Sequence, residues 1–117
     1  MSNFKSRLRP EQIRTVNSAS FNGIGGTFFP FQIASADSPI TNPSRILIIS
    51  NRSGVDVMIS WDGVLDHVLI PAGGSFILDE GSNAVSGAEY NTAARTQFYA
   101  RGAASTGLVY LSTFYAY

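Results

Sequence analysis

The chain has 117 residues and no net charge, and only 14% of its residues are charged whereas 44% are hydrophobic. This length supports one domain with a single core, and the lack of cysteine excludes disulfides, thiolate metal sites and thiol nucleophiles. We find neither a secretory signal nor an apolar run long enough for a membrane helix. So few charges indicate either that another molecule covers part of the surface, or that the surface is polar but uncharged and rich in Ser, Thr, Asn and Gly.

The beginning of the chain is basic. Residues 1–14 contain one acid, Glu11, against four basic residues: Lys5, Arg7, Arg9 and Arg14. The remaining residues contain four arginines against seven acids. Because charges at this density resist packing against a core, we predict an extended arm that contacts an acidic partner, either nucleic acid or protein. A solvated terminus is the alternative.

Two local features follow in this region. Pro10 suits the first position of a helix, so residues 9–14 are the one place where a helical turn is expected. Three glycines within residues 21–26 predict a flexible joint or a bulged turn, which could serve as a hinge. We therefore divide the chain into an N-terminal arm with a glycine hinge, residues 1–26, and a β-sandwich body, residues 27–117.

The body has the composition of strands and turns. Short runs of Val, Ile, Thr, Phe and Tyr alternate with Gly, Pro, Asn and Asp, a pattern typical of strands. We predict an all-β fold, a single antiparallel β-sandwich of jelly-roll or immunoglobulin type, with a small barrel as the alternative. About eight short strands are expected, at residues 14–20, 27–33, 45–50, 55–61, 64–70, 75–79, 95–101 and 107–115.

The stretch of residues 57–70 contains the only tryptophan and the only histidine of the chain. Asp62-Gly63 favours a type I′ hairpin turn, because both residues tolerate positive φ. This two-residue loop would place Val57 opposite Val68 and Ile59 opposite Asp66, and a four-residue loop would shift these partners but keep the same faces. Alternation then predicts a core face with one polar member, Asp66: Val55, Val57, Ile59, Trp61, Val64, Asp66, Val68 and Ile70. His67 is expected on the opposite face, so it cannot join Asp66 in a metal site or catalytic pair.

No catalytic or metal-binding constellation is predicted. The acidic turn at residues 79–83 lacks the spacing of an EF-hand loop. One histidine and no nucleophile elbow give no support for a hydrolytic triad. Nothing singles out Asp79 with Glu80 or Glu89 as the paired acids of a glycosidase. We predict that the protein is not an enzyme and that it takes no cofactor or metal.

Aromatic residues also raise the question of nucleic-acid binding, which combines stacking rings with interleaved basic residues. The candidate rings are Phe28, Phe29, Phe31, Phe98 and Tyr99. Only Arg95 and Arg101 flank one set of these rings, and aromatic residues of strands more commonly belong to the core. Nucleic acid is therefore not an expected partner.

The last stretch, residues 107–117, is an uncharged strand whose two faces are both apolar or aromatic. A strand covered on both sides in a small sandwich implies contact beyond its own core, most simply with another subunit. The interface residues predicted are Tyr110, Phe114, Tyr115 and Tyr117. A solvent face decorated with Tyr and Ser is the alternative.

From Ser38 onward, about two thirds of the chain resembles small structural proteins of tailed bacteriophage particles. An N-P-[ST]-R turn opens a strand, a DG…DH hairpin and a P-A-G-G turn follow, and a G-x-V-Y-x-S-x-F-Y strand closes the pattern. The matching positions are Asn42, Pro43, Ser44, Arg45, Asp62, Gly63, Asp66, His67, Pro71, Ala72, Gly73, Gly74, Gly107, Val109, Tyr110, Ser112, Phe114 and Tyr115. The resemblance implies a β-sandwich attached to the capsid shell or built into the head–tail junction.

We therefore expect a virion structural protein, a capsid decoration or cement protein that assembles in the host cytoplasm and binds the major capsid protein or other virion proteins. A homo-oligomer is expected, and no membrane. The expected capsid contacts are the arm and the neighbouring aromatic residues: Lys5, Arg7, Arg9, Arg14, Phe28, Phe29 and Phe31. The alternatives are a head–tail connector or tail component, and a carbohydrate- or receptor-binding sandwich in which Trp61, Tyr90 or Tyr99 stacks on a sugar.

Overall fold

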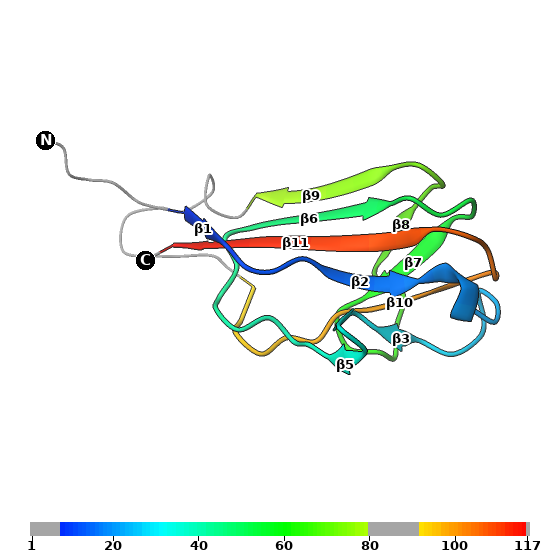
Figure 1. Cartoon of the computed structure of the whole chain (residues 1–117), viewed down its shortest axis with the longest axis horizontal. Helices are drawn as coiled ribbons and strands as arrows, with labels where there is room; N and C mark the ends of the chain where they lie inside the picture. Colours follow the sequence, from blue (N-terminus) through cyan, green and yellow to red (C-terminus); the bar gives the residue numbers. More distant parts are fainter. Residues whose placement is uncertain (1–7, 80–91, 117) are drawn as a thin grey trace, which may run out of the picture.

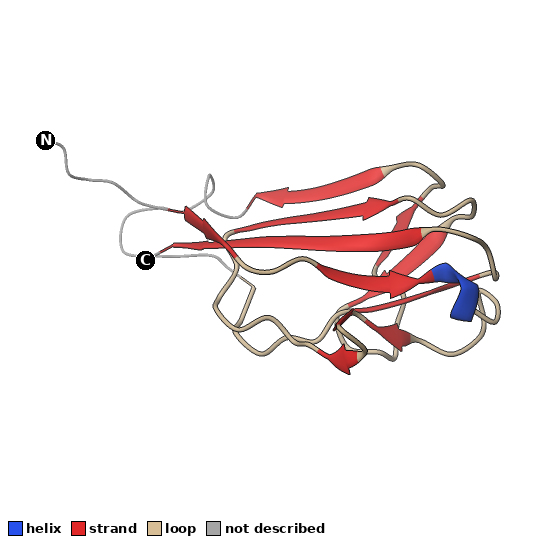
Figure 2. Ribbon diagram, viewed as in Figure 1, coloured by secondary structure: helices blue, strands red, loops and turns tan. Residues whose placement is uncertain are grey.

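The chain folds into two antiparallel β-sheets (Figures 1 and 2), which confirms the predicted all-β class. The computed structural model describes residues 8–79 and 92–116. The larger sheet contains β1 (Leu8–Pro10), β2 (Arg14–Asn17), β4 (Gln32–Ile33), β5 (Ala36–Asp37), β6 (Ile46–Asn51), β9 (Ser75–Asp79) and β11 (Leu108–Ala116). The smaller sheet contains β3 (Phe29–Pro30), β7 (Val57–Ser60), β8 (Val68–Ile70) and β10 (Tyr99–Gly102), and a short 3-10 helix, η1, spans Ser18–Ser20.

Strand β11 lies in the middle of the larger sheet (Figure 1), whose order is β5-β4-β2-β11-β6-β9. It pairs with β6 along one edge, and with β2 and β1 along the other. The order of the smaller sheet is β3-β10-β7-β8. Both edges of β11 are therefore occupied by neighbouring strands.

The core lies between the inner faces of the two sheets. Alternate residues of the central strands point inward and are fully buried: Leu47 and Ile49 of β6, Val57 and Ile59 of β7, Ala100 of β10, and Val109 and Leu111 of β11. The rings of Phe31 and Phe98 are also buried there. This alternation is the period-two pattern of strands with one covered face. Burial of each large apolar side chain stabilises the fold by about 1.5–3 kcal/mol.

One polar side chain, Asn51, is fully buried at the end of β6. Its amide nitrogen donates to the carbonyl oxygens of Val55, Ile70 and Pro71 at 2.8, 3.0 and 3.2 Å. Its oxygen accepts hydrogen bonds from the backbone N–H and the hydroxyl of Ser53. Because its polar groups are paired, these hydrogen bonds offset the cost of removing the amide from water. It joins the turn after β6 to the end of β8, and hence one sheet to the other.

The start of the chain differs from the expectation. Residues 9–14 form no helical turn, because β1 and β2 are extended and pair with β11. The tertiary pairing overrides the weak local preference of Pro10 for a helix start. Residues 8–17 therefore belong to the larger sheet rather than to a free arm. Residues 1–7 lie outside the described part of the chain.

The expected glycine hinge at residues 21–26 is also packed against the sandwich. The side chain of Phe21 is only 3% exposed, and the backbone N–H of Gly23 donates to the carbonyl oxygen of Gly102 at 2.8 Å. The boundary expected at residue 26 therefore does not separate an arm from a body within the described residues.

A β-bulge lies between β1 and β2, which run along the same edge of β11. The register changes by one residue from one strand to the next, so residues 11–13 face only two residues of β11. An extra residue in a strand reverses the side to which the following side chains point. Glu11 and Arg14 would lie on opposite faces of a regular strand, but the bulge turns both toward the inside of the sandwich.

Two other strands of the structure differ from the predicted ones. The expected strand 27–33 is divided into β3 of the smaller sheet and β4 of the larger one, and the chain crosses between the sheets at the buried Phe31. The expected strand 64–70 is shortened to β8. Of the remaining predicted strands, β9 has the predicted bounds and the others are present with shifted ends. Within the described residues we find no helix of the length and apolarity that a membrane crossing requires.

Candidate functional site

The outward side of the larger sheet, hereafter the outer face, is the candidate interaction surface. Its side chains alternate with the buried ones on β6, β9 and β11: Ile46, Ile48, Ser50, Ser75, Ile77, Asp79, Leu108, Tyr110, Ser112 and Phe114. None of those on β6 and β11 is charged, and the carboxylate of Asp79 lies on the edge strand β9. The central part of the outer face, on β6 and β11, is thus uncharged, and such a sheet surface is typical of a protein-binding site.

The strand register gathers the apolar side chains of the outer face into one strip. Ile48 lies opposite Ile77 of β9 and opposite Ser112 of β11, and Ile46 lies opposite Phe114. Side chains that face each other across strands lie in contact distance. Ile77 is 63% exposed, and the side chains of Ile46, Ile48 and Phe114 are half-buried. The strip is therefore continuous from the middle of the sheet to its β9 edge.

The predicted interface residues divide between two sides of β11. Tyr110 and Phe114 lie on the outer face. Tyr115 instead lines a hollow of about 310 Å³ together with Glu11 and Asn42. Tyr117 lies outside the described residues.

Sequence reasoning missed Ile46, Ile48 and Ile77 as members of this surface. The available signal was the unbroken apolar run at residues 46–49. Such a run lacks the alternation of a strand with one solvated face and is typical of a strand covered on both sides.

The basic residues expected in the arm do not form one surface. Arg14 is buried, with a side chain only 4% exposed, so it is unavailable to a partner. Arg9 lies in the exposed strand β1. Lys5 and Arg7 lie outside the described residues. The expectation counted Arg14 among repelling surface charges, but Glu11 compensates its charge inside the fold.

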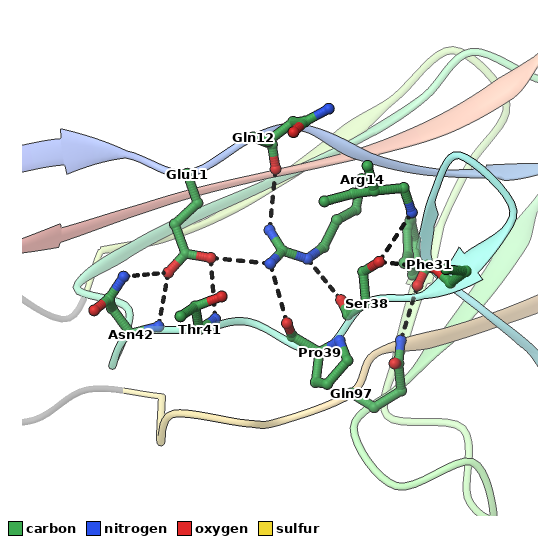
Figure 3. A network of polar contacts seen from close by, with 11 residues as sticks. Glu11, Gln12, Arg14, Phe31, Ser38, Pro39, Thr41, Asn42 and Gln97 are labelled. Carbon is green, nitrogen blue, oxygen red and sulfur yellow. Dashed lines mark hydrogen bonds and ion pairs between the residues drawn. The ribbon is translucent and has the colours of Figure 1, made fainter.

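Figure 3 shows how the guanidinium of Arg14 is satisfied. It donates to three carbonyl oxygens: Nε to Ser38 at 2.6 Å, Nη1 to Gln12 at 3.0 Å and Nη2 to Pro39 at 3.0 Å. Nη2 also forms an ion pair with Oε1 of Glu11 at 3.0 Å. A buried guanidinium held by several acceptors and a counter-ion is typical of a structural anchor.

The carboxylate of Glu11 is satisfied in the same way (Figure 3). It accepts hydrogen bonds from the backbone N–H groups of Thr41 and Asn42 at 3.1 and 2.7 Å, and from the side-chain amide of Asn42 at 3.0 Å. Burial alone would raise the pKa of Glu11, but these hydrogen bonds and the charge of Arg14 together lower it. The pair fastens residues 38–42 to the bulge between β1 and β2.

The aromatic residues expected to contact a capsid have different surroundings. Phe31 is fully buried, and Phe29 packs against the core, with its ring 6.0 Å from that of Phe21. Phe31 is therefore a core residue rather than a contact with a neighbouring protein. Phe28 is half-buried and lies under the guanidinium of Arg101, 4.1 Å from it, a cation–π contact.

The hairpin at residues 57–70 forms with a longer connection than expected. Val57 pairs with Ile70 and Ile59 with Val68, so the faces are as predicted but the partners are shifted by two residues. Residues 61–67 form the connection. Val64, which was expected in the core, is 72% exposed because it lies in this loop.

The turn itself is held by Asp62 rather than by a tight type I′ geometry. Oδ1 of Asp62 accepts hydrogen bonds from the backbone N–H groups of Val64 and Leu65 at 2.8 and 3.0 Å. These bonds lower the pKa of Asp62. Gly63 has the positive φ, 76°, that favours glycine.

The other polar residues of this hairpin also have structural roles. Asp66 forms a bidentate ion pair with Arg101, at 3.0 and 2.8 Å. Nδ1 of His67 accepts a hydrogen bond from the backbone N–H of Trp61 at 3.0 Å. His67 and Asp66 therefore have separate partners and do not act on a common atom.

A sugar-stacking platform would need an aromatic ring with a free face. The indole of Trp61 lies among three rings, with centroids 5.1 Å from Phe98, 6.3 Å from Phe76 and 5.8 Å from His67. The ring of Tyr99 lies close against Gly63, and Tyr90 lies outside the described residues.

No group of three or more His, Asp or Glu side chains that could hold a metal ion occurs in the described ranges 8–79 and 92–116. Most of the acidic turn after residue 79, which was considered as a calcium loop, falls outside these ranges.

Comparisons with protein-family models, with curated proteins and with solved structures found no match to this chain.

Proposed function

We propose that this protein is a structural component of a tailed-bacteriophage particle, a capsid decoration or cement protein that binds a neighbouring shell protein through its outer face. The observation that carries the proposal is the uncharged strip across β6 and β11, which extends to the exposed Ile77. Water contact with such a surface is unfavourable, and burial against another protein removes that cost.

The motif positions that resemble phage structural proteins support this role. Residues 42–45 lead into β6, residues 71–74 connect β8 to β9, and residues 107–115 include most of β11. These segments precede, connect or form strands of the outer face, whereas the DG…DH positions lie in the connection between β7 and β8. The resemblance and the candidate surface therefore share β11 and the turns that lead into β6 and β9.

The mechanism needs only modest affinity for each copy. Apolar burial contributes about 25 cal/mol per Å², and a shell presents many equivalent sites. Contacts made simultaneously by neighbouring copies raise the effective concentration of each. Lys5 and Arg7 are proposed to add contacts with acidic groups of the shell.

The test is reconstitution of particles from the phage that encodes the chain. Particles assembled without the protein are mixed with the purified full chain, and bound protein is separated on a density gradient. We expect the unaltered chain to bind and Ile48→Lys, on the outer face, to bind at least about tenfold more weakly, which corresponds to ~1.4 kcal/mol.

The matched control is Leu69→Lys, a change of a half-exposed apolar residue on the smaller sheet, which should bind normally. Circular dichroism checks that both variants are folded. No binding by the unaltered chain, or an equal loss in both variants, would overturn the proposal. Image reconstruction of the particle then distinguishes a shell protein from a head–tail connector by the position and copy number of the bound chain.

A further inference from the structure

The edge of the larger sheet formed by β9 differs from the other strand edges of the described residues. Natural edges are usually short or contain proline or lysine, which prevents pairing with another chain. Here β5 has two residues, β1 contains Pro10, β3 contains Pro30, and the three-residue β8 is followed by Pro71. Strand β9 has five residues, SFILD, with no proline or lysine, and lies at the end of the sheet (Figure 1).

The hydrogen-bond pattern identifies the backbone groups on that edge. The N–H of Asn51 donates to the carbonyl oxygen of Gly74 at 2.8 Å, so the carbonyl of residue 74 points toward β6. In an antiparallel ladder this direction alternates, so Phe76 and Leu78 also face β6. The N–H and C=O of Ser75 and Ile77 therefore point away from the sheet, toward any strand that lies alongside.

We propose that two copies of this chain pair through β9, antiparallel and about a two-fold axis at Ile77, so that their larger sheets form one continuous sheet. The inference rests on the geometry of the strand and does not depend on the phage role. The proposed partner of β9 is the β9 strand of a second copy, because the strand is complementary to itself in this register.

In this register every group that points outward meets a suitable partner. Ile77 of one copy faces Ile77 of the other, and Ser75 faces Asp79, which together allow roughly six backbone hydrogen bonds. On the inner side, Phe76 of one copy faces Leu78 of the other. Both are only half-buried within one chain, so the pairing covers their remaining apolar surface.

The charges also favour this register. Each Asp79 carboxylate lies opposite the hydroxyl of Ser75 in the second copy. The two carboxylates are separated by four residues along the strands, about 13 Å, which is beyond the screening length at physiological salt. A register centred on Asp79 would instead place the two carboxylates face to face, which is unfavourable.

The lack of native cysteine allows a direct test of the register with the full chain. Ile77→Cys places two thiols across the proposed axis at about 5.5 Å between Cα atoms, within disulfide range. We expect this variant to form a covalent dimer under mild oxidation. The matched control is Ser75→Cys on the same strand, whose thiols would lie about 13 Å apart and should not cross-link.

Sedimentation analysis over a concentration series gives a second measurement without cysteine. The unaltered chain should reach twice the mass of one copy, and Ile77→Lys should raise the dimer dissociation constant at least about tenfold. Ile24→Lys, a change of an exposed isoleucine away from β9, should leave it unchanged. Cross-linking of both cysteine variants or of neither would overturn the pairing, as would a chain that stays monomeric at every concentration. Such a monomer that still binds particles would leave the proposed function intact.

Discussion

The buried pair of Glu11 and Arg14 provides the sharpest test of the packing described above. Glu11→Gln keeps the shape of the side chain but removes its charge. The carboxylate accepts four contacts within 3.1 Å, two at each oxygen, from Arg14, Thr41 and Asn42. In the variant, one oxygen becomes an NH₂ group that faces two donors. Each lost charged hydrogen bond costs about 1.5–3 kcal/mol, and breaking a buried ion pair costs about 3–5 kcal/mol.

We therefore expect Glu11→Gln to lower the free energy of unfolding by about 3–5 kcal/mol, and the melting temperature by roughly 10–20 °C. Urea titration followed by circular dichroism measures the first, and calorimetry measures the second. The control is Asp37→Asn, a change of an exposed carboxylate that accepts one side-chain hydrogen bond, from Gln32 at 2.8 Å. It should change stability by less than about 0.5 kcal/mol. A loss below ~1 kcal/mol for Glu11→Gln would refute the anchoring role.

Three further predictions concern stability, each measured by urea titration. The stability difference between the unaltered chain and Glu11→Gln should shrink as the pH falls below the ordinary carboxyl pKa of 4.5. The lowered pKa of Glu11 stabilises the folded state only while the carboxylate is ionised, so this contribution is lost as the carboxylate becomes protonated. A difference that stays constant with pH would contradict this assignment. Thr113→Val should leave stability unchanged or higher, since the buried hydroxyl of Thr113 has no partner among the described residues, and a loss above ~1 kcal/mol would show otherwise. Gly107→Ala should destabilise by about 1–3 kcal/mol, because φ is +100° and an added Cβ would overlap the carbonyl of Arg52, whereas Gly25→Ala, with open space and no positive φ, should be nearly neutral.

Most strands could be predicted because their signal is local. The run at residues 75–79 has three consecutive strand-favouring apolar residues between Ser75 and Asp79, and it forms β9 with the predicted bounds. Asp62-Gly63 marked the reversal of the chain between β7 and β8. The length of that connection could not be predicted, because a shift of two residues keeps every side chain on the same face.

The anchor at Glu11 and Arg14 could not be predicted, because its signal is not local. The sequence shows a basic terminus with one acid, which is typical of a solvated arm. The pair forms only because a bulge places both side chains inward and because residues 38–42, far along the chain, supply the remaining hydrogen-bond partners. The outer face was partly foreseen from Tyr110 and Phe114, but its extension to Ile77 depends on strand order, which composition does not reveal.

The position of β11 has a consequence for biosynthesis. This strand follows every other described strand in the chain, yet β2 and β6 meet only through it. Until residues 108–116 leave the ribosome, the nascent chain carries two unjoined halves of a sheet with open edges and uncovered apolar side chains. Such species aggregate readily, and the pairing that protects them spans most of the chain, which slows folding. The yield of folded protein should therefore depend on chaperone capacity until β11 has emerged from the ribosome.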